Sequence, residues 1–159
     1  MASVEERLAA LEARVAAIDD ERGVLANMYR YAHAIDYGLD GEWIDCFTED
    51  GVFDQRRRPG FDPVEGQRHQ GRDALAAFIA THTQAPETYH KHLMVQPRIQ
   101  VDGDHAATAS FFLRLDEDPA GAPYILVFGR YRDSVRRCTD GRWRFEERIV
   151  EIEVIQPRP

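Results

Sequence analysis

Four long strand-like segments in the second half of the chain constrain its fold more than any other feature. They are separated by Asp102-Gly103, by residues 119–123 and by Asp140-Gly141, and they span residues 90–101, 105–115, 124–135 and 142–155. An Asp-Gly pair between two such segments predicts a tight hairpin, because a type I′ turn needs positive φ at both central residues. We therefore predict an antiparallel meander of four long strands.

The beginning of the chain has the pattern of a long amphipathic helix. Apolar residues alternate at intervals of four and three, at Val4, Leu8, Leu11, Val15 and Ile18, which is the spacing of one helix face. Gly23 predicts a kink or a break into two helices, because glycine weakens a helix interior. The same spacing continues through Tyr29 to the carboxylate of Asp36, and Gly38 is expected to end the helix.

Shorter elements lie between this helix and the meander. We predict a second helix over residues 42–47, a short strand over 52–54, a long Arg-, Gly- and Pro-rich loop over 55–70 and a third helix over 73–81. Helices followed by a curled antiparallel sheet make an α+β fold, in which N-terminal helices pack on a strongly curved sheet and form a cone with an internal cavity. We expect one domain over residues 1–159, with residues 1–22 as an N-terminal helical extension.

The apolar face of this extension is a candidate contact surface. Residues 4–18 extend beyond what a minimal cone needs, and their apolar side chains require a partner. We expect a homo-oligomer, either a dimer or a trimer. In the alternative, the helix folds back on the sheet of its own chain.

Composition excludes several classes of function. The chain of 159 residues has 28 acidic and 20 basic residues, a net charge of −8, which is the wrong sign for binding phosphate backbones. It lacks an apolar run of about 18 residues for a membrane span, and residues 1–7 lack the features of a signal peptide, so a cytoplasmic location is expected. Abundant alanine and arginine, with Lys91 as the single lysine, indicate a GC-rich bacterial genome.

The sequence gives no sign of a cofactor. There is no phosphate-binding glycine loop and no GxSxG motif. Cys46 and Cys138 lie far apart and fit no zinc or redox spacing, so we expect both to be small buried or half-buried residues. Any chemistry is therefore expected to be proton transfer without a cofactor.

Asp36 and a pair of histidines are the candidates for that chemistry. A carboxylate on an apolar helix stripe has to be paired, hydrogen-bonded or close to water, so Asp36 belongs either to a site or to the helix end at the surface. On a strand, His90, His92 and Met94 share one face. A metal needs further ligands that the neighbouring residues do not offer, so we predict none; the remaining interpretations are a half-buried structural histidine or a general base oriented by Asp36.

Several segments resemble one family along nearly the whole chain. They are Tyr31-Ala-His-Ala-Ile-Asp36, Trp43, Phe47-Thr-Glu-Asp-Gly-Val-Phe53, Gly71-Arg-Asp-Ala-Leu75, His92-Leu-Met-Val95, Ile99-Gln-Val-Asp-Gly-Asp104 and Asp140-Gly-Arg-Trp143. Together they resemble a SnoaL-like domain of the nuclear-transport-factor-2-like superfamily. The resemblance implies the cone fold and is closest to the branch of scytalone dehydratase, bile-acid dehydratase and lindane dehydrochlorinase.

That branch uses an Asp–His pair, which the resemblance places at Asp36 and His92, and the bile-acid dehydratases add a catalytic tyrosine that corresponds to Tyr31. Helix geometry favours Tyr29 instead, because five residues turn a straight helix by about 140° from Asp36, whereas seven residues nearly eclipse it. Tyr31 can reach the cavity only if the helix is distorted or is wrapped by the sheet. We keep Tyr31 as the catalytic candidate and Tyr29 as a substrate-binding one.

The other expected substrate-binding residues are His33, Trp43 and Arg148. His33 lies one turn before Asp36 and is alternatively a packed helix residue. Arg148 either faces the cavity or pairs with a glutamate on the outer surface of the last strand. The arginines of residues 56–58 are either simply solvated or attract acidic substrates to the cavity mouth.

We therefore predict a cofactor-free lyase or isomerase of dehydratase type. Its substrate would be a small hydrophobic polyketide, aromatic or steroid-like molecule, and His92 oriented by Asp36 would be the acid–base group. The alternative is a non-catalytic protein of the same fold, which binds small molecules or resembles the β subunit of an oxygenase.

Overall fold

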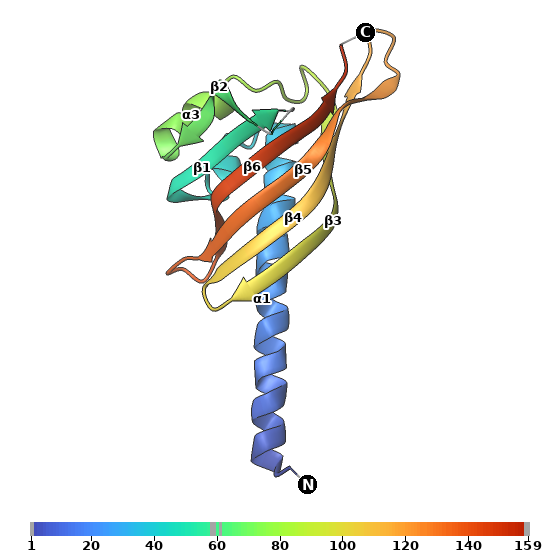
Figure 1. The fold of residues 1–159 in the computed structure, drawn as a ribbon. Helices are drawn as coiled ribbons and strands as arrows, with labels where there is room; N and C mark the ends of the chain where they lie inside the picture. The colour runs from blue at the N-terminus through green and yellow to red at the C-terminus, as the bar shows by residue number, and fades with distance from the viewer. Residues whose placement is uncertain (1, 58–59, 61, 158–159) are drawn as a thin grey trace.

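The computed structural model describes residues 2–57, 60 and 62–157, and its helices precede a curved sheet (Figure 1). The elements are α1 (Val4–Tyr37), α2 (Asp40–Ile44), β1 (Phe47–Arg57), β2 (Asp62–Gln70), α3 (Arg72–Ile79), β3 (His90–Asp102), β4 (His105–Glu117), β5 (Pro123–Arg137) and β6 (Trp143–Ile155). None of the helices in the described part of the chain is both long and apolar enough to cross a membrane.

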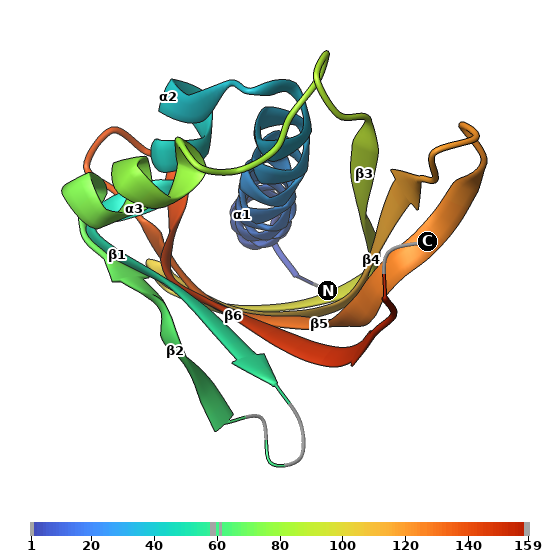
Figure 2. The same cartoon turned by 90° about the horizontal axis from the view of Figure 1, so that it is seen from above.

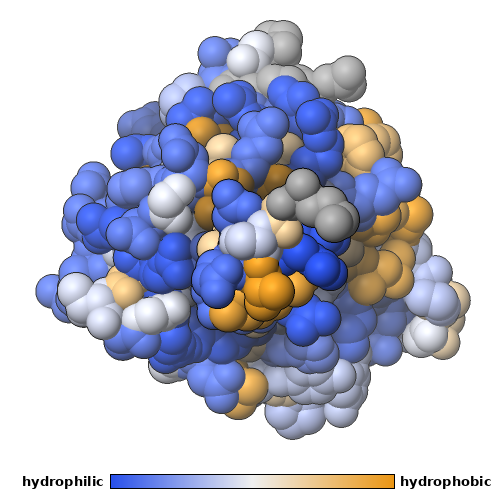
Figure 3. Space-filling view, turned by 90° about the horizontal axis from the view of Figure 1, so that it is seen from below, coloured by the Kyte–Doolittle hydropathy of each residue, from blue (hydrophilic) through white to orange (hydrophobic). Residues whose placement is uncertain are grey.

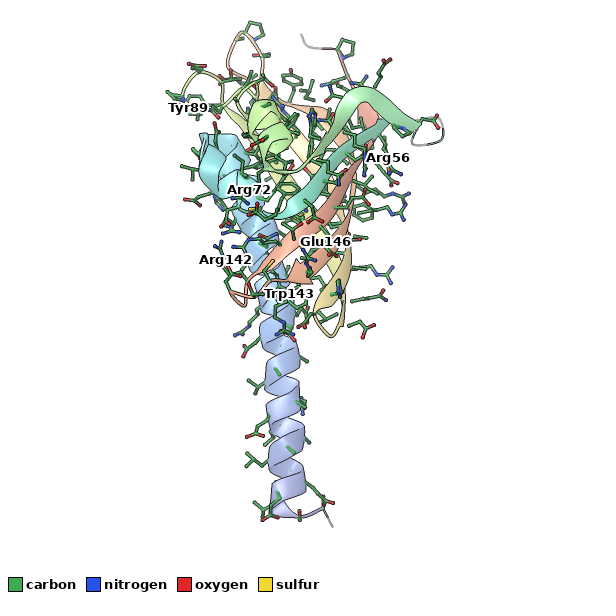
Figure 4. All side chains as sticks on the ribbon, turned by 90° about the vertical axis from the view of Figure 1, so that its left-hand side faces the viewer. Arg56, Arg72, Tyr89, Arg142, Trp143 and Glu146 are labelled. Carbon is green, nitrogen blue, oxygen red and sulfur yellow. The ribbon has the colours of Figure 1, made fainter. Side chains whose placement is uncertain are left out.

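Helix α1 is one continuous helix of 34 residues. Ser3 and Glu6 form a capping box at its start, and Gly38 ends it in the left-handed conformation at φ 68°. The predicted break at Gly23 is wrong. A Cβ there would lie 2.5 Å from Cδ1 of Trp143, so the glycine allows Trp143 to lie against the helix at the lower end of the sheet (Figure 4).

The six strands form one sheet in the order β2-β1-β6-β5-β4-β3. Strands β3 to β6 are antiparallel neighbours in chain order, which confirms the predicted meander. Strand β1 joins β6 in parallel. The α+β fold with a curved sheet is thereby confirmed.

The predicted loop over residues 55–70 is wrong. Strand β1 runs to Arg57, and β2 pairs with it antiparallel, for example at Phe53 and His69. Most side chains of β2 are exposed, so backbone hydrogen bonds form this edge without the apolar alternation that marks a half-buried strand. Arg58, the last of the three arginines predicted to lie at the cavity mouth or in solvent, lies outside the described residues.

The sheet curves around one side of α1, and α2 and α3 lie on the other side of that helix (Figure 2). Aromatic rings fill the closed end: Trp43 lies 4.9 Å from Phe47, and Tyr31 lies 5.8 Å from Phe145, between ring centroids. Cys46 is a free buried thiol and Cys138 a free half-buried one, as predicted.

A bulge in β6 changes which of its side chains face inward. Val135 pairs with Phe145 and Ser134 with Glu147, so Glu146 is an extra residue in β6 (labelled in Figure 4). As a result Phe145 and Arg148 are both completely buried, although strict alternation would place them on opposite faces.

Candidate active site

Asp36 and His92 meet inside the cone. Asp36 lies in the last turn of α1, and His92 is the third residue of β3. Oδ1 of Asp36 lies 2.7 Å from Nδ1 of His92, and the backbone N–H of His92 donates to both carboxylate oxygens at 3.2 and 3.1 Å. These bonds compensate for burial of a carboxylate that is only 4% exposed. With Nδ1–H donating to Asp36, the lone pair of His92 is on Nε2.

A cavity of about 430 Å³ opens beside this pair. Its wall combines apolar side chains from α1 and the sheet, such as Ile35, Phe53 and Val150, with the polar side chains of His92 and Arg114. A small ligand therefore has both an apolar surface and His92 within reach.

Tyr31 also lines this cavity. Four aromatic rings surround its ring, and burial raises the pKa of its hydroxyl to about 12, so it stays protonated at neutral pH and can donate a hydrogen bond. Tyr31 and Asp36 are both buried because α1 contacts β3 and β6 as well as α2. The helix is thus wrapped on more than one side, and Tyr29, which is 52% exposed, lies outside the cavity.

Two other expected cavity residues, His33 and Trp43, lie elsewhere. His33 is exposed on the outer face of α1, one turn from Tyr29. Trp43 is completely buried against the rings of Tyr31 and Phe47 and does not line the cavity. The expectation that these side chains contact substrate is wrong, because the outer face of α1 is solvated and the closed end of the cone is filled.

Arg148 is buried one layer behind the cavity wall. Its Nε and Nη2 donate to Oδ1 and Oδ2 of Asp133 at 2.9 and 2.8 Å, and its guanidinium lies 4.1 Å from the ring centroid of Tyr31. Both predictions for this residue are wrong, since it neither lines the cavity nor pairs with a glutamate at the surface. The bulge at Glu146 turns it inward.

Comparison with known proteins identifies the family. The sequence profile of the SnoaL-like domain matches residues 16–149. The chain belongs to the SnoaL-like domain family. None of the curated proteins compared with the chain matched it.

Solved structures share the fold of this SnoaL-like domain. An NTF2-like protein with a cystatin-like fold from Novosphingobium aromaticivorans is 22% identical, with a TM-score of 0.76 over 97% of this chain and 91% of that one. A protein assigned as the β subunit of an aromatic-ring-hydroxylating dioxygenase from the same species is 17% identical, with a TM-score of 0.76 over 89% and 94%. A protein from Catenulispora acidiphila, solved in complex with S-DNPA, is 26% identical, with a TM-score of 0.69 over 85% and 94%.

The SnoaL-like domain also places His82 and His90 around His92; the sequence indicated His90 as its neighbour on one strand face but not His82. The ring centroids of His82, His90 and His92 lie 5.3 to 5.7 Å apart. Burial lowers the pKa of His90 to about 4 and that of His82 to about 3, so both are neutral at pH 7. No sequence pattern points to His82, which lies just after α3.

These three residues could hold a metal ion, since one nitrogen from each lies within 4.8 Å of the others. The third nitrogen, which the chain neighbours of His90 and His92 do not offer, belongs to His82. The charged groups around the three rings have both signs: after burial, Arg114 lowers the pKa of His82 and of His90, and Asp36 raises both.

Proposed function

We propose that this SnoaL-like domain is a cofactor-free lyase or isomerase of dehydratase type. The observation that carries the proposal is the 2.7 Å contact between Oδ1 of Asp36 and Nδ1 of His92, a residue that lines a cavity of about 430 Å³. A histidine held by a carboxylate beside an apolar cavity is a general acid–base unit with room for a small hydrophobic substrate. Substrates of polyketide, aromatic or steroid type fit that description.

In the proposed reaction, Nε2 of His92 removes a proton from a carbon next to a carbonyl group. The electron pair of the broken C–H bond forms an enolate, and the carboxylate of Asp36 stabilises the imidazolium that results. If the neighbouring carbon carries a hydroxyl group, the imidazolium returns the proton to that group and water leaves. If it does not, return of the proton to another carbon isomerises the substrate.

The enolate oxygen gains negative charge and needs a hydrogen-bond donor. Tyr31 fits this role because it lines the cavity and its hydroxyl, with a pKa raised to about 12 by burial, stays protonated. A donor of this kind strengthens its hydrogen bond as charge develops, and so contributes mainly in the transition state.

The alternative is a non-catalytic binding protein or an oxygenase β-subunit-like protein. The likeness to the dioxygenase subunit is at 17% identity and concerns the fold. A purely structural subunit needs neither an open cavity nor a buried carboxylate bonded to a histidine at its wall. This pairing favours the enzyme.

Hydrogen exchange with solvent tests the proposal even when the product of the reaction is not identified. A panel of hydroxylated aromatic and polycyclic ketones is incubated with the protein in D₂O, and deuterium uptake next to the carbonyl is followed by mass spectrometry. We expect at least one ketone to exchange, and His92→Gln and Asp36→Asn to slow exchange by about 100-fold or more.

His33→Gln is the matched control, because it removes an exposed imidazole from the same region of the fold. Circular dichroism shows whether each variant remains folded. Full exchange activity in either folded dyad variant would overturn the mechanism, and a panel that binds in the cavity without any exchange would favour the non-catalytic protein.

A further inference from the structure

The charge of the cavity wall differs from that of the whole protein. The chain has 28 acidic and 20 basic residues, yet the residues that line the cavity include Arg57 and Arg114 and, among those the structure describes, no aspartate or glutamate. Asp36 and Asp116 lie behind this wall, bonded to His92 and Arg114, so the charged side chains that line the cavity are cations and point to a ligand that carries negative charge.

Arg114 is held directly beside the proposed base. It is the cross-strand partner of His92 in the β3–β4 ladder, so the two Cβ atoms lie on the same face at about 5 Å from each other. Asp116 accepts hydrogen bonds from Nε and Nη2 of Arg114 at 2.6 and 3.1 Å. That pair fixes the guanidinium, and none of the residues that the structure describes bonds to Nη1, which therefore can bind a ligand.

Arg57 extends the positive charge to the cavity mouth. It is an exposed residue at the end of β1, and no ion pair is found between it and the other residues that the structure describes. An exposed arginine at a cavity mouth attracts anions from solution, whereas a half-buried one beside His92 forms stronger charge-assisted hydrogen bonds.

We infer that the ligand of this cavity is an apolar molecule with one carboxylate group, and that Arg114 binds the carboxylate next to His92. This inference deepens the proposed function by naming its substrate class. The reaction of that substrate rests on the proposed function, whereas the binding of the substrate does not. Binding there would place the carbon two or three bonds from the carboxylate within reach of Nε2 of His92. The substrate class is therefore hydroxylated aromatic or polyketide-like keto acids rather than neutral sterols.

Two fluorescent dyes of similar size test this inference without any reaction. 8-Anilino-1-naphthalenesulfonate carries one anionic group, and N-phenyl-1-naphthylamine is its neutral counterpart. We expect the protein to bind the anionic dye about 10-fold more tightly, which corresponds to about 1.4 kcal/mol. Arg114→Gln should abolish that preference and leave the affinity for the neutral dye unchanged.

Arg56→Gln is the matched control, because Arg56 lies next to Arg57 but pairs with Asp54 and does not line the cavity. Leu126→Trp fills the cavity and should abolish binding of both dyes. Equal affinities for the two dyes, an unchanged preference in Arg114→Gln, or a preference that survives Leu126→Trp would each overturn the inference. Since neither dye reacts, these outcomes are independent of whether His92 is a base.

A second, independent inference concerns the N-terminal part of α1, which extends away from the cone (Figure 1). Its apolar seam is solvent-exposed: Val4, Leu8, Leu11, Val15 and Ile18 are 48 to 75% exposed. Seen from the N-terminal end of the helix, hydrophobic side chains gather near the centre of the view (Figure 3). The spacing of the seam is that of the a and d positions of a coiled coil.

The residues beside the seam carry opposite charges. Glu5, Glu12 and Asp19 occupy the e positions, and Arg7 and Arg14 the g positions. In a parallel pair, each g residue meets the e residue five positions later on the partner, which pairs Arg7 with Glu12 and Arg14 with Asp19. In an antiparallel pair, like charges would meet along both sides of the seam.

The cone attaches to the other side of the helix. Asp20 accepts a hydrogen bond from Arg137 of β5 at 2.6 Å, and Trp143 packs at Gly23; both positions lie away from the seam. Tyr29, in the same heptad register, is also exposed, whereas Leu25 between it and Ile18 packs against the core. Two cones can therefore stand side by side while their helices pair.

We infer that a second copy of this chain covers the seam as a parallel two-stranded coiled coil. Val4→Cys, made together with Cys138→Ser, should form a disulfide-linked dimer on mild oxidation, because a parallel pair brings the two d positions together. Ala13→Cys, on the outer side of the helix, is the matched control and should remain uncrosslinked. Leu11→Glu should convert the dimer to a monomer in light scattering.

The inference is overturned if the protein is a monomer at micromolar concentrations. It is also overturned if Ala13→Cys crosslinks as readily as Val4→Cys. If the protein is a monomer, the apolar seam would instead be a surface for a helix of a different protein. Equal crosslinking would mean that the helices meet by random collision.

Discussion

The buried histidines make the stability of the fold depend on pH. His90 is 2% exposed, and the pKa of its imidazole is lowered to about 4. Burial is the largest cause; among the charged neighbours, Arg114 and His92 lower the pKa, and Asp36 and Asp116 raise it. In the unfolded chain the pKa is about 6.5, so the unfolded state binds a proton over a pH range in which the folded state does not.

The sign of the effect follows from this difference. The contribution of neutral His90 to stability is present above pH 6.5 and is lost as the pH falls towards 4. Between pH 7.5 and pH 5.0, His90 alone should lower the free energy of unfolding by about 2 kcal/mol. His82, with a pKa of about 3, acts in the same direction.

Urea unfolding followed by circular dichroism at the two pH values measures this loss. His90→Phe keeps an aromatic ring, and neither ring nitrogen of His90 has a hydrogen-bond partner among the described residues, so the variant should fold. Between pH 7.5 and pH 5.0, we expect the free energy of unfolding of His90→Phe to fall by about 2 kcal/mol less than that of the wild type. His33→Phe, at an exposed position, should behave as the wild type. Equal losses in the wild type and His90→Phe would refute the argument.

Two further predictions concern packing. Gly129→Ala should lower the free energy of unfolding by about 3 kcal/mol or more, because the added Cβ would overlap the backbone oxygen of Glu151. Gly41→Ala is the control: its Cβ would have nothing within 4 Å, so this variant should be neutral or slightly stabilising in the same urea titration. Asp133→Asn should cost about 3 kcal/mol by leaving buried Arg148 without its carboxylate. The double variant Asp133→Leu/Arg148→Met should recover much of that loss, and a double variant less stable than Asp133→Asn would contradict this interpretation.

The parts of the fold that follow from local chemistry were predictable from the sequence. Asp102-Gly103 and Asp140-Gly141 both mark turns between strands, and both glycines adopt a positive φ, 59° and 79°. Gly38 ends α1 because it adopts a positive φ at low cost. The unexpected contact at Gly23 depends instead on Trp143, which is 120 residues away in the chain, and no local pattern contains it.

The candidate site was predictable in its central pair and not in its surroundings. Asp36 interrupts an apolar stripe, and this anomaly, together with the family resemblance, was sufficient to pair it with His92. The side-chain directions of the sheet depend on bulges, at Glu146 in β6 and between Val95 and Arg98 in β3, and each bulge reverses the alternation beyond it. The sequence does not locate these bulges, so it could not predict on which face of the sheet Arg114 and Arg148 lie.

The strand order also has a consequence for how the chain folds. Strand β6 lies between β1 and β5, so the last of these six strands to be synthesised is an inner strand of the sheet. Until residues 143–155 are available, the β1–β2 hairpin and the β3–β5 meander are two separate sheets, each with an unpaired edge. The cavity has walls on both, with Phe53 from one and Leu126 from the other. Cavity formation should therefore be the final event of folding, and removal of β6 should leave two aggregation-prone half-sheets rather than a smaller cone.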